Sequence, residues 1–294
     1  MKNSLLLIFL LLISTAFSQP SFDLIITDGK IIDGTGNSWF YGDVGIQAGK
    51  IAAIGKLSGE FAIKTISAKG LIVAPGFIDV HTHIEGNDLK VPTADNFIYD
   101  GVTSVVTGNC GGSNVDINDY FRKLDSVKTS INVATLIGHN SVRREIMGES
   151  NRTPTDDEQK RMEDLVERAM QDGAVGFSTG LIYVPGTYSK TDEVIGLARA
   201  ASKYNGIYAS HIRDEGDDVL DAIEEAINIG RQANMPVEIS HFKVTYKPNW
   251  GRSAQTLDKV VKARQAGIDV TIDQYPYIAS STTLNTLVPS WALA

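Results

Sequence analysis

The sequence is poor in cysteine, has no cluster of basic residues and contains no apolar run long enough to cross a membrane as a helix. Its 294 residues carry a formal net charge of −8, which is spread along the chain. This charge argues against nucleic acid or an anionic lipid surface as a partner. The hydrophobic fraction of 43% is enough for a large buried core, so we expect a folded protein. The acidity by itself names no substrate.

The longest apolar run lies in residues 1–18 and falls short of the ~20 residues that span a bilayer. It follows Lys2 and ends in small residues at Ala16 and Ser18, which is the pattern of a cleavable secretory signal peptide. We therefore predict an exported protein, periplasmic or extracellular, that has no membrane association once the signal is removed.

Cys110 is the only cysteine of the chain. An oxidising compartment favours paired cysteines, so a lone thiol is unexpected in an exported protein. This observation alone leaves two interpretations open. Cys110 is either a small buried residue without chemistry or a thiol with a functional task.

Residues 19–75 show short strand patterns that are separated by turns with glycine, and they predict a small β domain. From residue 76 onward, strand patterns alternate with helix patterns. Seven strands are predicted in the segments GFIDVHTH, TSVVTGNC, NVATLIGH, AVGFSTG, GIYASHIR, PVEISHFK and DVTIDQYPY. Strands that alternate with helices pair in parallel, in a doubly wound sheet or in a (β/α)8 barrel.

Two helices show their ends in the sequence. Thr155 is predicted as the N-cap of a helix that ends before Gly173, and Ser253 as the N-cap of a helix that ends before Gly267. A barrel needs eight strands, and the chain ends shortly after the seventh. We therefore expect residues 76–294 to hold strands one to seven of a barrel that is truncated at its C-terminus.

Two histidines, His81 and His83, stand one residue apart at the end of the first predicted strand. Side chains two positions apart in a strand point to the same side, which is the geometry that two ligands of one ion need. A hydrogen-bonded pair of histidines in a half-buried strand explains this motif equally well.

The other candidate ligands also follow predicted strands. Cys110 follows the second strand, His139 ends the third, and His211 and His241 lie near the ends of the fifth and sixth. The carboxyl ends of parallel strands meet at the face where such folds bind ligands, so these side chains are expected to converge. Imidazole and thiolate suit zinc, a Lewis acid without redox chemistry, and they indicate hydrolysis.

Seven motifs follow one another along the chain: APGFIDVHTH, TGNCG, GHNSVR, GFSTGLIYVPG, SHIRDEG, ISHFK and DQYPYIASST. Over residues 22–294 they resemble the D-aminoacylases, or N-acyl-D-amino-acid deacylases, of the amidohydrolase superfamily. The resemblance implies an α/β fold, a (β/α)8 TIM-like hydrolase barrel without its last strand, and a small β-sandwich-like N-terminal domain that the missing C-terminus would complete. It also implies zinc-dependent hydrolysis of the amide bond of N-acyl-D-amino acids by metal-activated water, which yields a carboxylate and a free D-amino acid.

The resemblance implies five metal ligands in two positions, of which the first is held by His81 and His83 and the second by Cys110, His211 and His241. One or two zinc ions are expected. Many members of the superfamily bridge two metals with a carboxylated lysine on the fourth strand, where this sequence has Ser178 and Thr179. Cys110 is expected to replace that bridge, which would explain the lone thiol.

Four further residues are candidates for substrate contacts. Lys243, Tyr275 and Ser280 are candidates for the substrate carboxylate, and Tyr183 is a candidate for a catalytic hydrogen bond to the substrate carbonyl. The general base of the family, an aspartate on the eighth strand, would lie beyond residue 294. Residues 1–294 alone are therefore expected to be inactive.

Two expectations concern polar residues around the ligands. Arg213, Asp214 and Glu215 are expected to form a salt-bridge cluster that orients His211. His139 stays outside the proposed ligand set, because it can face the substrate or bond to a neighbouring strand end.

Three alternative functions stay open. A cyclic-amide hydrolase, such as a dihydroorotase or hydantoinase, is disfavoured by Cys110 and by the missing lysine of the fourth strand. A metal-poor binding protein on the same scaffold is disfavoured by the complete ligand set. A cysteine hydrolase with Cys110 as nucleophile would make most of the convergent histidines a coincidence.

Overall fold

The computed structural model describes residues 21–288 and residue 292. The predicted signal peptide at residues 1–18 lies outside the described residues, so export stays a prediction. Among the described residues, every helix is too short or too polar to span a bilayer. The chain divides into two compact units, Met1–Pro75 and Gly76–Ala294.

The first unit contributes one five-stranded sheet. Its strands are β1 (Phe22–Ile31), β2 (Phe40–Gln47), β3 (Lys50–Gly55), β4 (Ala62–Ser67) and β5 (Ile72–Val73). β1 lies in the middle of the sheet, antiparallel to β2 and parallel to both β4 and β5, and β3 extends the sheet beyond β2.

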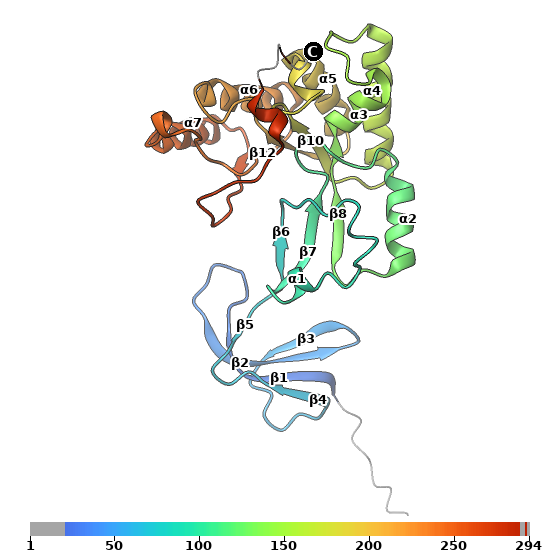
Figure 1. Cartoon of the computed structure of the whole chain (residues 1–294). Helices are drawn as coiled ribbons and strands as arrows, with labels where there is room; N and C mark the ends of the chain where they lie inside the picture. The colour runs from blue at the N-terminus through green and yellow to red at the C-terminus, as the bar shows by residue number, and fades with distance from the viewer. Residues whose placement is uncertain (1–20, 289–291, 293–294) are drawn as a thin grey trace, which may run out of the picture. The chain divides into compact units, whose positions relative to one another are not determined.

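The second unit is built on parallel strands that form in each of the seven predicted segments (Figure 1). They are β6 (Phe77–Asp79), β7 (Val102–Thr107), β8 (Asn132–Thr135), β9 (Ile137–Gly138), β10 (Gly176–Gly180), β11 (Ile207–His211), β12 (Val237–Ile239) and β13 (Val270–Ile272). The third predicted strand is interrupted at Leu136, so that β8 pairs with β7 while β9 pairs with β10. This one segment therefore joins a three-stranded sheet to a five-stranded sheet.

Helices separate most of the strands. They are α1 (Asp95–Ile98), α2 (Ile117–Val127), α3 (His139–Met147), α4 (Asp156–Gln171), α5 (Thr191–Ser202), α6 (Val219–Ala233) and α7 (Ser253–Gln265), with single 3-10 turns at Gly186–Tyr188, Lys247–Asn249 and Leu284–Leu287. From α3 to α7, each helix contacts the next one along the chain. The buried core lies between these helices and the strands, and β10 is buried at every residue.

The spatial order of the strands from β6 to β13 is their order in the chain, and all their pairings are parallel. This is the architecture of a (β/α) barrel. Among the described residues no backbone pairing joins β13 to β6, so the ring of strands is open at that edge. Phe77 and Ile78 of β6 are accordingly exposed.

The two predicted helix starts have different outcomes. Thr155 is the N-cap of α4, where its hydroxyl accepts a hydrogen bond from Glu158 N and the Glu158 carboxylate accepts one from Thr155 N. The prediction for Ser253 is wrong by one residue, because Arg252 is the N-cap of α7 and makes no capping bond with its side chain. Ser253 is instead the first helical residue, and its hydroxyl makes no capping bond with the described residues.

This difference predicts unequal effects of two similar substitutions. Thr155→Ala should lower the free energy of unfolding by about 1 kcal/mol, the usual contribution of an N-cap side chain. Ser253→Ala should change it by less than about 0.5 kcal/mol, as expected of a surface position without a capping role. Urea denaturation of both variants measures the effect, and equal losses of stability would contradict the assignment of the caps.

Candidate metal centre

Five candidate ligands reach one place because each lies at or just beyond the carboxyl end of a strand. His81 and His83 lie in the loop after β6, and not within the strand as the sequence pattern suggested. Cys110 lies in the loop after β7, His211 is the last residue of β11, and His241 lies just beyond β12. Parallel strands in chain order present these ends on one face, so residues far apart in the sequence become neighbours.

Cys110 lies at the centre of these side chains. Its Sγ atom is 3.5 Å from His81 Nε2, 3.6 Å from His211 Nδ1 and 3.7 Å from His241 Nε2. The ring of His83 lies beside that of His81, with 5.4 Å between the centroids. These side chains form two groups of donors. One group consists of His81, His83 and Cys110, and the other of Cys110, His211 and His241. Within each group the donor atoms lie within 4.8 Å of one another. The thiol belongs to both groups.

The backbone around Cys110 is tightly constrained. Cys110 has a φ of 53°, in the left-handed region that favours glycine. A Cβ atom on the next residue, Gly111, would come within 2.2 Å of Asn140 Oδ1. His241 also has a positive φ, of 37°. Such conformations persist only where the surrounding packing imposes them, and they are common at functional sites.

Two carboxylates orient the imidazoles from behind. Asp273, directly after β13, has Oδ2 2.9 Å from His81 Nδ1, and its Oδ1 accepts a hydrogen bond of 2.5 Å from His241 N. Glu215 Oε1 lies 2.9 Å from His241 Nδ1. A carboxylate can only accept a hydrogen bond, so it keeps the imidazole proton on Nδ1. The lone pair of each Nε2 is then directed towards Cys110.

Burial controls the protonation of the cluster. It lowers the pKa of His211 to about 3, with a further effect of His241, and it raises the pKa of the Cys110 thiol to about 12, with further effects of Asp273 and Glu215. Burial also opposes ionisation of Glu215, but a hydrogen bond from His241 and the nearby positive charges bring its pKa down to about 2. The imidazole of His211 is therefore neutral and the thiol is protonated unless a cation is present.

The donors fit a zinc ion. Neutral imidazole and thiolate are the usual nitrogen and sulfur ligands of zinc, and each of the two groups offers three protein ligands, the number found at catalytic zinc sites. A cation among these donors would favour the thiolate that burial disfavours. His211 and His241 suit such a role because His211 Nδ1 and His241 Nε2, 2.8 Å apart, both face the sulfur.

His139 has a different environment from the other four histidines. Its side chain is fully buried, and its Nε2 lies 2.9 Å from Glu193 Oε1. The guanidinium of Arg143 approaches the same oxygen at 3.6 Å. His139 is therefore part of a buried polar network behind the loops and does not face the donor cluster.

The structure brings two of the three candidate carboxylate-binding residues to the cluster. Lys243 Nζ donates to Glu215 Oε1 at 2.6 Å and lies 5.7 Å from the centre of the Tyr275 ring. Tyr275 also stacks on Tyr277. Ser280 is exposed and forms no hydrogen bond with the described residues, so it is not gathered with the others.

Tyr183 lies directly against the donor cluster. Its ring meets that of His211 edge to face, with 4.8 Å between the centroids. The phenol oxygen is 3.1 Å from Thr282 Oγ1, and burial raises the pKa of the phenol. The hydroxyl group is therefore protonated at neutral pH and can donate a hydrogen bond.

The salt-bridge cluster expected at residues 213–215 does not form. Arg213 pairs with Glu225 of α6 at 2.9 Å, and Asp214 accepts hydrogen bonds from backbone N–H groups of its own loop. Glu215 contacts His241 closely but lies 3.9 Å from His211. The chain turns after β11, so these three successive side chains point in different directions.

Two carboxylates at the cluster, Asp273 and Glu85, are not predicted from the sequence. Asp273 follows β13 as the histidines follow their strands, and the same rule would have found it. Glu85 accepts hydrogen bonds of 2.5 Å from Thr107 Oγ1 and from Gly108 N. It thereby ties the loop of His83 to the loop of Cys110, a long-range contact that no local pattern indicates.

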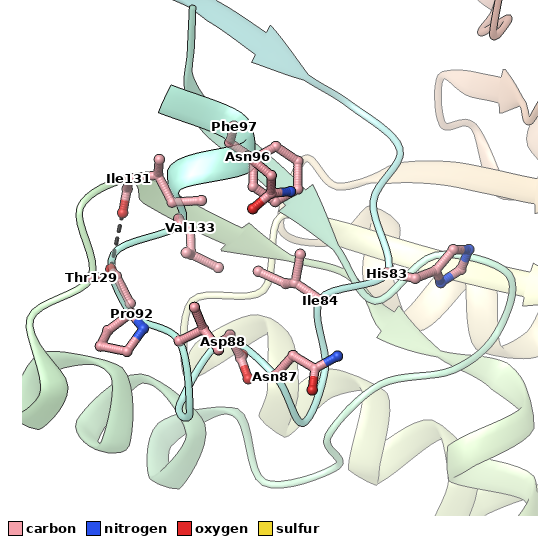
Figure 2. Close-up of a pocket in the computed structure, with 12 residues that line it drawn as sticks. His83, Ile84, Asn87, Asp88, Pro92, Asn96, Phe97, Thr129, Ile131 and Val133 are labelled. Atoms are coloured by element: carbon pink, nitrogen blue, oxygen red, sulfur yellow. Dashed lines mark hydrogen bonds between the residues drawn. The ribbon is translucent and has the colours of Figure 1, made fainter. Parts of the chain in front are cut away.

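A cavity of about 320 Å³ lies next to the loop that carries His83. Ile84, Phe97, Ile131 and Val133 contribute apolar walls, and Figure 2 shows the ring of His83 pointing away from these side chains. Cys110 and the other histidines do not line this cavity. It therefore adjoins the donor cluster at His83 alone.

Comparisons with known proteins agree with this geometry. The chain is 40% identical to the D-aminoacylase of Alcaligenes xylosoxydans xylosoxydans, over 92% of this chain and 60% of that protein. The crystal structure of N-acyl-D-glutamate deacylase from Bordetella bronchiseptica, complexed with zinc and a phosphonate inhibitor, matches with a TM-score of 0.84 and 41% identity, over 87% of this chain and 59% of that one.

A third match is a structure of a D-aminoacylase that has a binuclear metal centre. It has a TM-score of 0.84 and 38% identity, over 87% of this chain and 59% of that one. These neighbours confirm the (β/α) barrel and the resemblance found in the sequence. The chain spans about 60% of the length of the curated D-aminoacylase that it matches. The model of the amidohydrolase family matches residues 64–285, and the chain therefore belongs to that family.

Proposed function

We propose that the protein hydrolyses the amide bond of N-acyl-D-amino acids with the help of zinc held by His81, His83, Cys110, His211 and His241. The observation that carries the proposal is a thiol shared by two groups of imidazoles at the carboxyl ends of parallel strands. The similarity to D-aminoacylase and to N-acyl-D-glutamate deacylase supports the substrate class. Zinc bound there would supply the Lewis acidity for attack of water on an amide carbonyl.

The residues of this chain have separable tasks in that reaction. Asp273 and Glu215 hold His81 and His241 in the orientation that directs Nε2 towards Cys110. Tyr183 presents a protonated phenol beside His211, where it can donate to the substrate carbonyl. Lys243 supplies a positive charge at the edge of the cluster, which suits the carboxylate of an N-acyl amino acid.

Asp273→Asn tests the proposed zinc site. An asparagine amide can donate to His81 Nδ1, which would move the imidazole proton to Nε2 and remove that lone pair from the metal. We expect the affinity for zinc to fall by about 10- to 100-fold, the usual effect of losing such a partner. Zinc bound at equilibrium with a competing chelator measures this.

Asp269→Asn is the matched control. Asp269 is exposed, and its carboxylate pairs with Arg264 at a distance of 3.4 Å. The control variant should bind zinc as the unmodified protein does. Unchanged affinity in Asp273→Asn as well would show that His81 does not ligate zinc through Nε2.

The substrate class is tested with pairs of enantiomers on a chain that spans the full length of the D-aminoacylase relative, of which residues 1–294 cover 60%. We expect release of the free amino acid from N-acetyl- and N-formyl-D-amino acids and not from the L-forms, and loss of this activity on removal of zinc. Amine release is measured before and after treatment with chelator, and again after zinc is restored. Comparable turnover of L-substrates, or a preference for hydantoins, would favour a cyclic-amide or other amidohydrolase activity.

Lys243→Met tests recognition of the carboxylate. Loss of a hydrogen bond to a charged group costs about 1.5–3 kcal/mol, so KM for an N-acetyl-D-amino acid should rise by about 10- to 100-fold. The corresponding N-acetyl-D-amino acid amide has no carboxylate, and its KM should change little. A similar rise in KM for both substrates would show instead that Lys243 acts by holding Glu215 in place. The zinc content of the variant is measured in the same preparations.

A further inference from the structure

The loop after β10 carries Tyr183. Side chains from other elements hold this loop in place by hydrogen bonds to its backbone carbonyl groups. This segment, residues 180–189, is called the Tyr183 loop. The donors come from α3 and from the loop after β11: Asn140 to Gly180 and Tyr183, Arg144 to Val184, Arg143 to Pro185, and Arg213 to Thr187 and Ser189. The loop is therefore fixed along its length by hydrogen bonds that do not depend on its own side chains.

Asn140 is the central member of these donors. Its side chain is buried, and Nδ2 donates to Gly180 O at 3.1 Å and to Tyr183 O at 3.2 Å. Its Oδ1 accepts from Gly180 N at 3.4 Å. Both ends of the amide are thus used, and an isosteric carboxylate could not make the two donated bonds.

Asn140 also contacts the loop of Cys110. Cβ atoms on Gly111 or Gly186 would come within 2.2 Å and 2.6 Å of Asn140 Oδ1. A Cβ on Gly180 would approach Cys110 O to 2.1 Å and Tyr183 Cδ2 to 2.7 Å. The loop of the thiol and the Tyr183 loop therefore approach each other closely, with Asn140 between them. α3, which carries Asn140, lies beside β10 (Figure 1).

Two arginines anchor the far part of the loop, and each is paired with a carboxylate. The fully buried guanidinium of Arg143 donates to Pro185 O at 3.2 Å and lies 3.6 Å from Glu193. Arg213 donates to Thr187 O and Ser189 O at 3.2 Å each while it pairs with Glu225. A buried charged group is costly unless it is bonded in this way, so Arg143 resists displacement. Arg213 is half-buried and is held by its bonds to the two carbonyl groups and to Glu225.

We propose that Asn140 is a positioning residue that fixes the phenol of Tyr183 relative to Cys110 and His211, with Arg213 as the second anchor of the same loop. The proposal rests on the proposed function for the role of Tyr183, but the effect on the loop can be measured without it. Because hydrolysis depends on geometry within fractions of an ångström, a displaced phenol costs rate even when the ligands stay in place.

The first test is hydrogen exchange of the whole chain with Asn140→Asp. The carboxylate would face the carbonyl oxygens of Gly180 and Tyr183, so the amides of Thr187 and Ser189, which bond within the loop, should exchange roughly tenfold faster. Zinc content should be unchanged. Asn151→Asp, the same change at an exposed position, is the control and should leave the loop as it is. Unchanged exchange in Asn140→Asp overturns the proposal.

The second test is a double-mutant cycle with Tyr183→Phe. Asn140→Asp should lower kcat/KM by about 10- to 100-fold in the unmodified protein, but by less than about twofold when Tyr183 is already Phe. Equal effects in both backgrounds would show that Asn140 does not act through Tyr183. If a chain that spans the full length of the D-aminoacylase relative hydrolyses none of the substrates, the proposed function fails, and the exchange experiment still decides the positioning role.

Arg213→Lys provides a second variant if Asn140→Asp does not fold. Lysine keeps a positive charge for Glu225 but lacks the fork that reaches two carbonyl oxygens. Faster exchange confined to residues 186–189, together with a smaller effect on kcat/KM in the Tyr183→Phe background, is expected. Exchange that is unchanged in the loop, or raised throughout the second unit, would overturn the proposal.

Discussion

The placement of one thiol among three imidazoles is the constraint on which the second unit depends. Cys110 reaches its position only with a left-handed backbone, and the loops from β10 and α3 approach it so closely that glycine is required at Gly111 and Gly180. The barrel supplies the face on which strand ends meet. The loops then bring the sulfur within 3.7 Å of imidazole nitrogens that lie 29 to 131 residues away in the chain.

Carboxylate and amide side chains next to the donors fix the orientation of the donor groups. Asp273 contacts both His81 and the backbone of His241, so one side chain links the two donor groups at the edge where β6 and β13 do not pair. Asn140 has the comparable position between Cys110 and the Tyr183 loop. Each of these residues comes from a different strand end, which couples the fold of the barrel to the geometry of the cluster.

The sequence predicted the parts of the structure that depend on local patterns. Strand periodicity located the parallel strands. The rule that ligands follow strand ends gave six candidates, including His139, and only the resemblance to the D-aminoacylases reduced them to the five donors. Thr155 was found because the capping box lies within four residues, whereas Ser253 was misplaced by one residue since no capping bond fixes the start of α7. Asp273, Glu85 and the network of Asn140 depend on contacts between distant loops, and no periodicity contains that information.

The charges of the cluster give a physical reason why it needs a divalent cation. Asp273, Glu215 and Glu85 place carboxyl groups around the thiol, and each of them disfavours its ionisation after the larger effect of burial. Lys243 opposes this effect, but its ammonium is already bonded to Glu215. A thiolate here would add a further negative charge to a half-buried acidic cluster. A doubly charged ion that binds the sulfur would compensate that charge and the neighbouring carboxylates together, so these acidic residues favour the cation even though they are not its ligands.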